Sequence, residues 1–158
     1  MQAPQAVVNK FAVELARRIL NKENIVFIDE TSVNMWMRIR MTYSTREEPV
    51  KLPLNKIRGQ GVTIYGAIGT QLPEFVHMIA NTTNEAHSAE FLRRIRMAYP
   101  WRQRPKIAVV LDNHPAHKTD TIKVLARNLN MELLYLPPYK PELNPIESLW
   151  SVVKRNIK

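Results

Sequence analysis

Two aspartates, Asp29 and Asp112, occur where a carboxylate would lose its hydration. Asp29 follows the apolar run of residues 25–28, and Asp112 follows the apolar run of residues 107–111. Such runs, rich in β-branched side chains, are typical of strands buried on both faces. A carboxylate there costs several kcal/mol unless it gains a partner or a metal ion, and a divalent cation would also relieve repulsion between two of them. The pattern predicts a metal site; the alternative is that each acid lies exposed beyond its strand or caps the next turn.

A third acid, Glu147, lies at the predicted start of the last helix. Asn144 is a suitable N-cap, Pro145 fits the first helical position, and Glu147 follows the cap by three residues. These positions describe a capping box, which contributes about 0.5–2 kcal/mol to a helix. A helix N-terminus also favours an ionised carboxylate, so capping and metal binding are compatible roles for Glu147.

The composition limits which metal such a site could hold. The chain has no cysteine, which excludes disulfides and thiolate ligands. Ligands must then come from carboxylates, histidines or carbonyl oxygens, and carboxylates favour a hard ion such as Mg²⁺ or Mn²⁺.

The charge of the chain indicates a polyanionic partner. Its 158 residues fit a single domain, and the formal net charge is +9. Basic residues are concentrated in residues 93–106 and 38–58, which favours nucleic acid, although a generally basic surface would also give this composition. No apolar run is long enough to span a membrane and the N-terminus resembles no signal peptide, so we expect a soluble intracellular protein.

Hydrophobic periodicity predicts an α/β domain. Helices are expected at residues 6–22, 84–99, 119–130 and 144–158, and strands at residues 25–28, 61–69, 74–80, 106–111 and 131–136. Residues 1–5 have no periodicity and are predicted to fray. Three successive strands followed by alternating helices and strands favour a mixed five-stranded sheet with helices on both faces.

Residues 32–60 do not fit a regular element. Trp36 and several methionines alternate with arginines, and Pro49 and Pro53 interrupt any helix or strand. We predict a long, basic, partly ordered insertion, because long loops within compact domains tend to be functional.

Three segments resemble the motifs of the mariner-like DDE transposases. They are Phe27-Ile28-Asp29-Glu30-Thr31, the segment from Val110 to His117 (VLDNHPAH), and the segment from Leu136 to Glu147 (LPPYKPELNPIE). The third is long and specific, Trp150 one turn later also matches, and the 34 residues between Asp112 and Glu147 are a spacing that this family uses. The resemblance covers residues 6–158 and implies an RNase H-like fold.

The resemblance implies that Asp29, Asp112 and Glu147 form a catalytic, metal-binding triad. It would hold two Mg²⁺ ions, for which Mn²⁺ can substitute, and these would activate the nucleophile and stabilise the leaving oxygen of an in-line displacement at phosphorus. Water would first nick DNA at the transposon end, and the freed 3′-hydroxyl would then attack target DNA.

DNA is therefore the expected partner. Arg38, Arg40 and Arg58 lie in the insertion, where related transposases carry a loop that touches DNA or the partner subunit; a solvated loop packed by Trp36 is the alternative. Further candidates for phosphate contact are His117, Lys118, Lys154 and Arg155. Asn113, His114 and His117, which follow the second acid, could contact the scissile phosphate or the second shell of the metal site; a turn or capping role is the alternative. The full-length protein is expected to form a homodimer without membrane contact, in the nucleus of a eukaryote or in the cytoplasm or nucleoid of a bacterium.

The chain departs from the family pattern at both ends. Nothing before Ala6 could form the N-terminal helix-turn-helix modules that recognise transposon ends, and the final helix is short, so we expect an excised catalytic domain or a truncated copy. Two alternatives are an RNase H-like nuclease that cleaves without joining, and a retired transposase domain that serves as a DNA-binding or assembly module.

Overall fold

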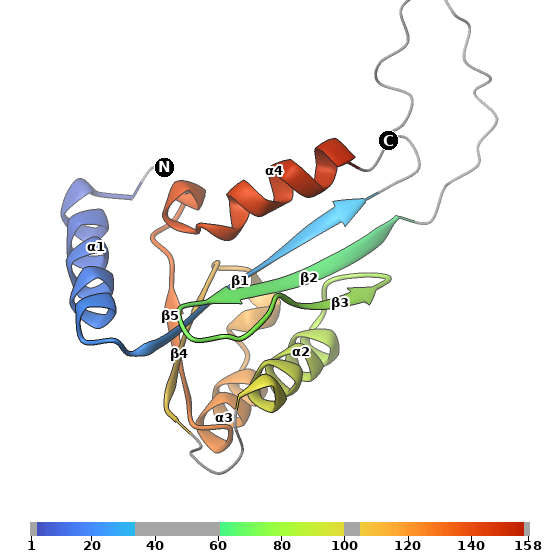
Figure 1. Ribbon diagram of the computed structural model, residues 1–158, viewed down its shortest axis with the longest axis horizontal. Coiled ribbons are helices and arrows are strands. Elements are labelled where there is room, and N and C mark those ends of the chain that lie inside the picture. The colour runs from blue at the N-terminus through green and yellow to red at the C-terminus, as the bar shows by residue number, and fades with distance from the viewer. Residues whose placement is uncertain (1–2, 34–60, 100–104, 157–158) are drawn as a thin grey trace, which may run out of the picture.

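Five strands form one mixed sheet, and helices cover both of its faces (Figure 1). The computed structural model describes residues 3–33, 61–99 and 105–156. In chain order, the helices and strands of these residues are α1 (Gln5–Leu20), β1 (Asn24–Val33), β2 (Val62–Gly69), β3 (Val76–Ala80), α2 (Glu85–Ala98), β4 (Ile107–Leu111), α3 (Asp120–Asn128), β5 (Met131–Tyr135) and α4 (Ile146–Asn156). Two short 3₁₀ turns, η2 (Pro115–His117) and η3 (Pro141–Leu143), follow β4 and β5. The predicted element order and α/β class are confirmed.

The order of the strands in the sheet is β3-β2-β1-β4-β5. β1, β2 and β3 are antiparallel neighbours, whereas β4 is parallel to both β1 and β5. Because β1 and β4 are parallel neighbours, residues that follow their paired segments lie at the same edge of the sheet. This topology brings the first and second predicted acids together.

β1 is longer than the sequence predicted, and Asp29 lies within it rather than after it. The parallel pairing with β4 ends at Phe27 opposite Val110, but the antiparallel pairing with β2 continues to Val33 opposite Val62. The sequence did not predict this continuation, because the residues after Ile28 are mostly polar and lack the apolar pattern of a buried strand. Beyond Ile28 the backbone of β1 is paired with β2 alone. Asp29 thus lies in a regular strand just beyond the point where β4 leaves it.

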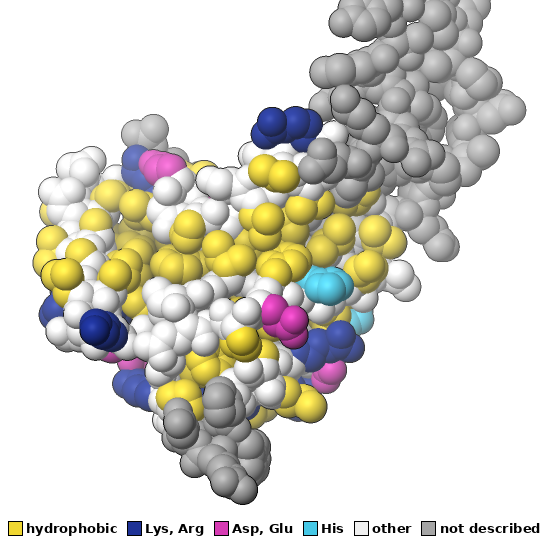
Figure 2. All heavy atoms as spheres, viewed as in Figure 1, with side chains coloured by type: hydrophobic (Ala, Val, Ile, Leu, Met, Phe, Trp, Pro, Cys, Tyr) yellow, Lys and Arg dark blue, Asp and Glu magenta, His cyan; other side chains and the backbone are white. Residues whose placement is uncertain are grey.

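The two faces of the sheet carry separate hydrophobic clusters. α2 and α3 cover the face that contains Val26 and Ile28, and α1 and α4 lie over the face that contains Phe27. Since successive side chains of a strand alternate, Asp29 points toward the α4 side and Glu30 points toward the α2 side. Figure 2 shows a band of hydrophobic side chains on the α1/α4 face, beneath α4.

An arginine fixes α1 to the sheet. Arg18 is only 9% exposed, and its guanidinium lies 2.8 Å from a carboxylate oxygen of Glu132 in β5. It also contacts Glu14 at 2.7 Å and Glu23 at 3.2 Å. A buried guanidinium needs this many partners, so the network sets where α1 lies against the sheet.

Two predictions concern residues that the structure does not describe. Residues 34–60 and 100–104 lie outside the described part, so the predicted insertion and its Arg38, Arg40 and Arg58 cannot be placed.

Within the described ranges, every helix is too short or too polar to cross a membrane.

Candidate active site

The three predicted acids line one pocket. Asp29 comes from the middle of β1, Asp112 directly follows β4, and Glu147 lies in the first turn of α4. The pocket has a volume of about 410 Å³, and the connector between β5 and α4 forms its opposite wall. The other lining residues are Asn113, Leu136, Pro137, Pro138, Tyr139, Lys140, Pro141 and Asn144. The fold thus brings these three acids, which are far apart in the sequence, to one pocket.

The carboxyl group of Asp29 is in an unfavourable electrostatic environment. Burial and then the negative charge of Glu147 raise its pKa to about 7, and the charge of Glu30 adds to this effect. A backbone hydrogen bond and a hydrogen bond from Trp150 act in the opposite direction but do not cancel it. A buried carboxyl beside a second acid is a group whose charged form a cation would stabilise.

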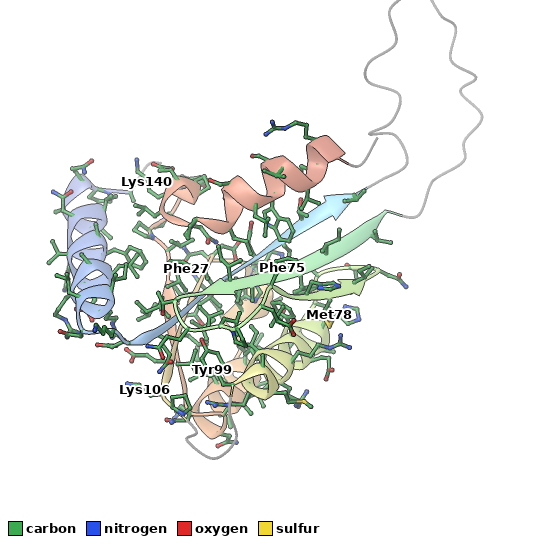
Figure 3. The ribbon with its side chains drawn as sticks, viewed as in Figure 1. Phe27, Phe75, Met78, Tyr99, Lys106 and Lys140 are labelled. Atoms are coloured by element: carbon green, nitrogen blue, oxygen red, sulfur yellow. The ribbon has the colours of Figure 1, made fainter. Side chains whose placement is uncertain are left out.

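Trp150 fixes the orientation of Asp29. The indole Nε1 donates to Oδ2 of Asp29 at 2.9 Å, and Trp150 is 2% exposed. Its ring lies over Gly66, the residue of β2 that pairs with Asp29. A Cβ atom at Gly66 would lie 2.5 Å from Cη2 of Trp150, so glycine is needed for this approach. Phe75, which is labelled in Figure 3, packs against the ring of Trp150, and their ring centroids are 6.2 Å apart.

Asp112 begins a tight turn that carries the second motif. Its Oδ1 accepts a hydrogen bond from the backbone N–H of His114 at 2.9 Å, and its side chain is 47% exposed. The Asn113 side chain donates to the carbonyl of Leu136 at 2.6 Å, which ties this turn to the end of β5. At the turn's other end, the Tyr135 hydroxyl donates to the carbonyl of His117 at 2.8 Å. Asn113 therefore has a turn-stabilising role, one of the two that the sequence left open.

His117 is buried below Asp112. It is 2% exposed, and its Nε2 lies 3.2 Å from Oε1 of Glu30 and 3.5 Å from Oδ1 of Asp112. Burial lowers the pKa of His117, but the contact with Glu30 and the charges of Glu30, Asp112 and Asp29 outweigh it, so the pKa is raised. The predicted phosphate contact does not suit this position, because a side chain closed off from solvent cannot reach DNA.

Glu147 does not form the predicted capping box. The backbone N–H of Asn144, which a capping box would use, donates to the carbonyl of Pro141 at 2.8 Å. Asn144 is 3% exposed; its side-chain nitrogen donates to the carbonyl of Ile28 at 3.0 Å, and its Oδ1 accepts from the backbone N–H of Ile146 at 3.4 Å, as an N-cap does. The N-cap residue thus ties the third motif to β1, next to Asp29, and the Glu147 carboxylate remains at the pocket.

The donor chemistry of the three acids fits a hard divalent cation. All three offer carboxylate oxygens, the ligands that Mg²⁺ and Mn²⁺ prefer. Among the described residues, the set of three ligating atoms that lie within 4.8 Å of one another is a different one, formed by Glu30, Asp112 and His117. Asp29, Asp112 and Glu147 share the pocket in a wider arrangement than this set.

Lys140 is a pocket residue to which the sequence gave no role. It lies in the connector that leads to α4 (Figure 3), and its Nζ is 3.1 Å from Oε1 of Glu142. It is the cationic side chain among the described residues of the pocket wall. Its position within the third motif was the available signal, because that motif also supplies Glu147.

The other predicted DNA contacts lie at the surface. Lys118 is exposed and lies over the ring of Tyr135, with 5.6 Å between Nζ and the ring centroid. Lys154 and Arg155 are exposed in the last turn of α4. All three are accessible to a phosphate backbone and stay predictions.

Comparisons with known proteins agree with this arrangement. A family model described as "DDE superfamily endonuclease" matches residues 24–158. The chain is 29% identical over 144 residues to the Transposable element Tcb2 transposase of Caenorhabditis briggsae, which covers 85% of this chain and 52% of that protein. It is 24% identical over 136 residues to the Insertion element IS630 uncharacterized 39 kDa protein of Shigella sonnei, which covers 84% of this chain and 38% of that protein. The chain thus spans about half or less of these relatives.

Solved structures share the fold. The Mos1 transposase paired-end complex with left transposon end superposes with a TM-score of 0.67 and 19% identity over 94% of this chain and 46% of that one. The Mos1 transposase catalytic domain with Raltegravir and Mg gives a TM-score of 0.64 and 16% identity over 96% of this chain and 72% of that one. The predicted RNase H-like fold is confirmed.

Proposed function

This chain belongs to the DDE superfamily of endonucleases, as its resemblance to mariner-like transposases predicted, and we propose that it is the catalytic domain of a DNA transposase. In this role it cleaves phosphodiesters at transposon ends and joins the 3′-hydroxyl to target DNA. The observation that carries the proposal is the meeting of Asp29, Asp112 and Glu147 at one pocket.

Asp29, Asp112 and Glu147 would hold two Mg²⁺ ions, with Mn²⁺ as a substitute. When bound, such a pair activates the attacking oxygen and stabilises the leaving oxygen of an in-line displacement at phosphorus. The raised pKa of Asp29 supports cation binding here, since burial and the charge of Glu147 are the penalties that a cation relieves. The structures described for Mos1 with Mg and with Mn contain these metals in a relative of the same fold.

The residues around the pocket would orient the reaction. Asp29 is held by Trp150 and Asp112 by its turn, so both acids meet the substrate with fixed geometry, which lowers the entropic cost of the reaction. Lys140 is placed to contact a phosphate oxygen. In the first step water forms a bond to phosphorus and the 3′ oxygen leaves with a proton. In the second, that 3′-hydroxyl loses its proton as its oxygen bonds to a target phosphorus, and the displaced 3′ oxygen of the target leaves with a proton.

DNA is the proposed partner, at transposon ends and at the target. Lys118, Lys154 and Arg155 are the exposed described candidates for backbone contact, and Arg38, Arg40 and Arg58 are candidates outside the described residues. A homodimer of the full-length protein would hold two ends together. Activity on genomic DNA would place the protein in the nucleus of a eukaryote, or in the cytoplasm or nucleoid of a bacterium.

A strand-transfer assay tests this proposal. A pre-cleaved duplex that carries the element's own terminal repeat is incubated with supercoiled plasmid, Mn²⁺ and the protein. We expect covalently joined products from the wild type and none from Asp112→Asn. Cleavage without joining would favour the nuclease alternative, and DNA binding without any metal-dependent product would favour the retired-transposase alternative.

A further inference from the structure

A second group of polar side chains lies beneath the active site, on the opposite face of the sheet. Glu30 follows Asp29 in β1, so its side chain points to the α2 side, where its exposed fraction is 11%. His117, from η2, lies between Glu30 and Asp112 with its Nε2 within 3.5 Å of an oxygen of each. The three residues form a continuous contact from the buried side of β1 to the pocket.

The surroundings favour a contact between protein groups over a ligand site. The cavity bordered by Glu30 and His117 has a volume of about 10 Å³, enough for about one water molecule. Oε1 of Glu30 is buried and has no hydrogen bond of good geometry among the described residues. The Nε2 atom of His117 lies 3.2 Å from it and forms an ion pair with it when the imidazole is protonated. The Tyr135 hydroxyl donates to the backbone carbonyl of His117 at 2.8 Å, which fixes the backbone that carries the imidazole ring.

Asp112 needs such support more than Asp29 does. Its side chain is 47% exposed and follows the last residue of β4, so no strand neighbour restrains it. Asp29 lies within a paired strand and accepts a hydrogen bond from Trp150. One hydrogen bond, from the backbone N–H of His114 to Oδ1, holds the Asp112 carboxylate in its turn. The contact with His117 on the same oxygen restricts the rotation of the carboxylate further, and a metal ligand that is already ordered binds its ion more tightly.

We propose that His117 is a positioning residue that holds the Asp112 carboxylate in its metal-binding orientation, with Glu30 fixing the imidazole from below. This inference rests on the proposed function, because it takes Asp112 as a metal ligand. His117 acts through Asp112 and touches neither metal nor DNA. In this role, His117 of the second motif and Glu30 of the first motif link the two motifs.

Mn²⁺ affinity of three His117 variants tests the proposal. Glutamine places its amide nitrogen near the position of Nε2, whereas asparagine places it near Nδ1, and leucine supplies no donor. We expect a dissociation constant within about 3-fold of wild type for His117→Gln, and about 10-fold weaker binding for His117→Asn and His117→Leu. Thermal melts without metal show whether each variant folds. If His117→Leu does not fold, the comparison of His117→Gln with His117→Asn still tests the proposal, because these two side chains are alike in polarity.

The possible outcomes separate this inference from the proposed function. If Asp112→Asn binds Mn²⁺ as the wild type does, the proposed metal site is wrong. If Asp112→Asn loses affinity but all folded His117 variants bind normally, only the positioning role is wrong. Pulsed electron paramagnetic resonance of bound Mn²⁺ gives an independent readout: coupling to an imidazole nitrogen would make His117 a direct ligand and overturn the proposal, whereas we expect no such coupling.

Discussion

Trp150 donates from Nε1 to Oδ2 of Asp29 across 2.9 Å, and this bond connects the helix of the third acid to the strand of the first. Trp150 follows Glu147 by one helical turn, so α4 supplies both an acid to the pocket and a donor to the acid beside it. The side chain of Asn144 makes a second connection, to the carbonyl of Ile28. The third motif therefore holds Asp29 in place as well as contributing Glu147.

Replacing Trp150 with phenylalanine tests this connection. Trp150→Phe keeps an aromatic ring but removes the N–H donor, so we expect Mn²⁺ binding about 10-fold weaker and a loss of about 1–2 kcal/mol in the free energy of unfolding. Titration calorimetry and thermal melts measure the two effects. Phe75→Leu is the matched control, since it alters packing against Trp150 but leaves the donor; equal metal affinities for both variants would contradict the role of the hydrogen bond.

Gly66 should tolerate no side chain while Trp150 is present. The Cβ of Gly66→Ala would lie 2.5 Å from Cη2 and 2.7 Å from Cζ2 of Trp150, so we expect a loss of about 1–3 kcal/mol in stability and weaker Mn²⁺ binding. Phenylalanine lacks both of these ring atoms. In a double-mutant cycle, Gly66→Ala should therefore cost less stability in the Trp150→Phe background, whereas additive effects would show that the two residues do not clash.

The raised pKa of Asp29 predicts how the metal-free protein responds to pH. Burial and the charge of Glu147 raise this pKa to about 7, above the ordinary value of 3.8, so the folded state binds more protons than the unfolded state between these pH values. Stability from this group is therefore greatest at low pH and is lost as the pH rises toward 7. Asp29→Asn removes the effect.

Melting curves in EDTA measure this difference. We expect Asp29→Asn to be about as stable as the wild type near pH 4 and more stable by about 1–2 kcal/mol at pH 8, a value reduced for solvent screening. Glu147→Gln should give a smaller gain, because it removes only the neighbouring charge. If the stability difference between Asp29→Asn and the wild type does not grow from pH 4 to pH 8, the raised pKa of Asp29 is wrong.

Lys140 should contribute to substrate binding. Lys140→Met removes the cation of the pocket wall but keeps an unbranched apolar side chain, so we expect about 10-fold slower DNA cleavage and a shallower salt dependence of DNA affinity, by about one unit of slope. Lys123→Met, on the exposed surface of α3 beside Asp120, is the control. Equal losses in the two variants would indicate that only overall charge matters.

The sequence predicted the fold well because its signals were local and periodic. The apolar runs before Asp29 and Asp112 identified two strands buried on both faces, which form the central parallel pair of the sheet, and helical spacing identified α1 to α4. The continuation of β1 beyond Ile28 was missed, since polar residues paired on one side give no hydrophobic pattern. The buried contact between His117 and Glu30 joins residues 87 positions apart, and no spacing in the sequence reveals such a contact.

The acids were found for different reasons. Asp29 and Asp112 were visible from their positions beside apolar strands, whereas Glu147 was recognised through the surrounding motif and had a local explanation as a capping residue. That explanation failed because the backbone N–H of Asn144 is already used by the carbonyl of Pro141, in the short turn before α4. The side-chain amide of Asn144 also donates to Ile28, a contact that forms only when distant segments meet and that the sequence does not reveal.

Anomalous diffraction from crystals soaked in Mn²⁺ would test the metal site most directly. We predict anomalous density bounded by the carboxylates of Asp29, Asp112 and Glu147, with two peaks about 3.5–4 Å apart when DNA is bound. Asp112→Asn crystals should lose this density. Density between Glu30, Asp112 and His117 instead, or none near Asp29 and Glu147, would contradict the proposed catalytic site.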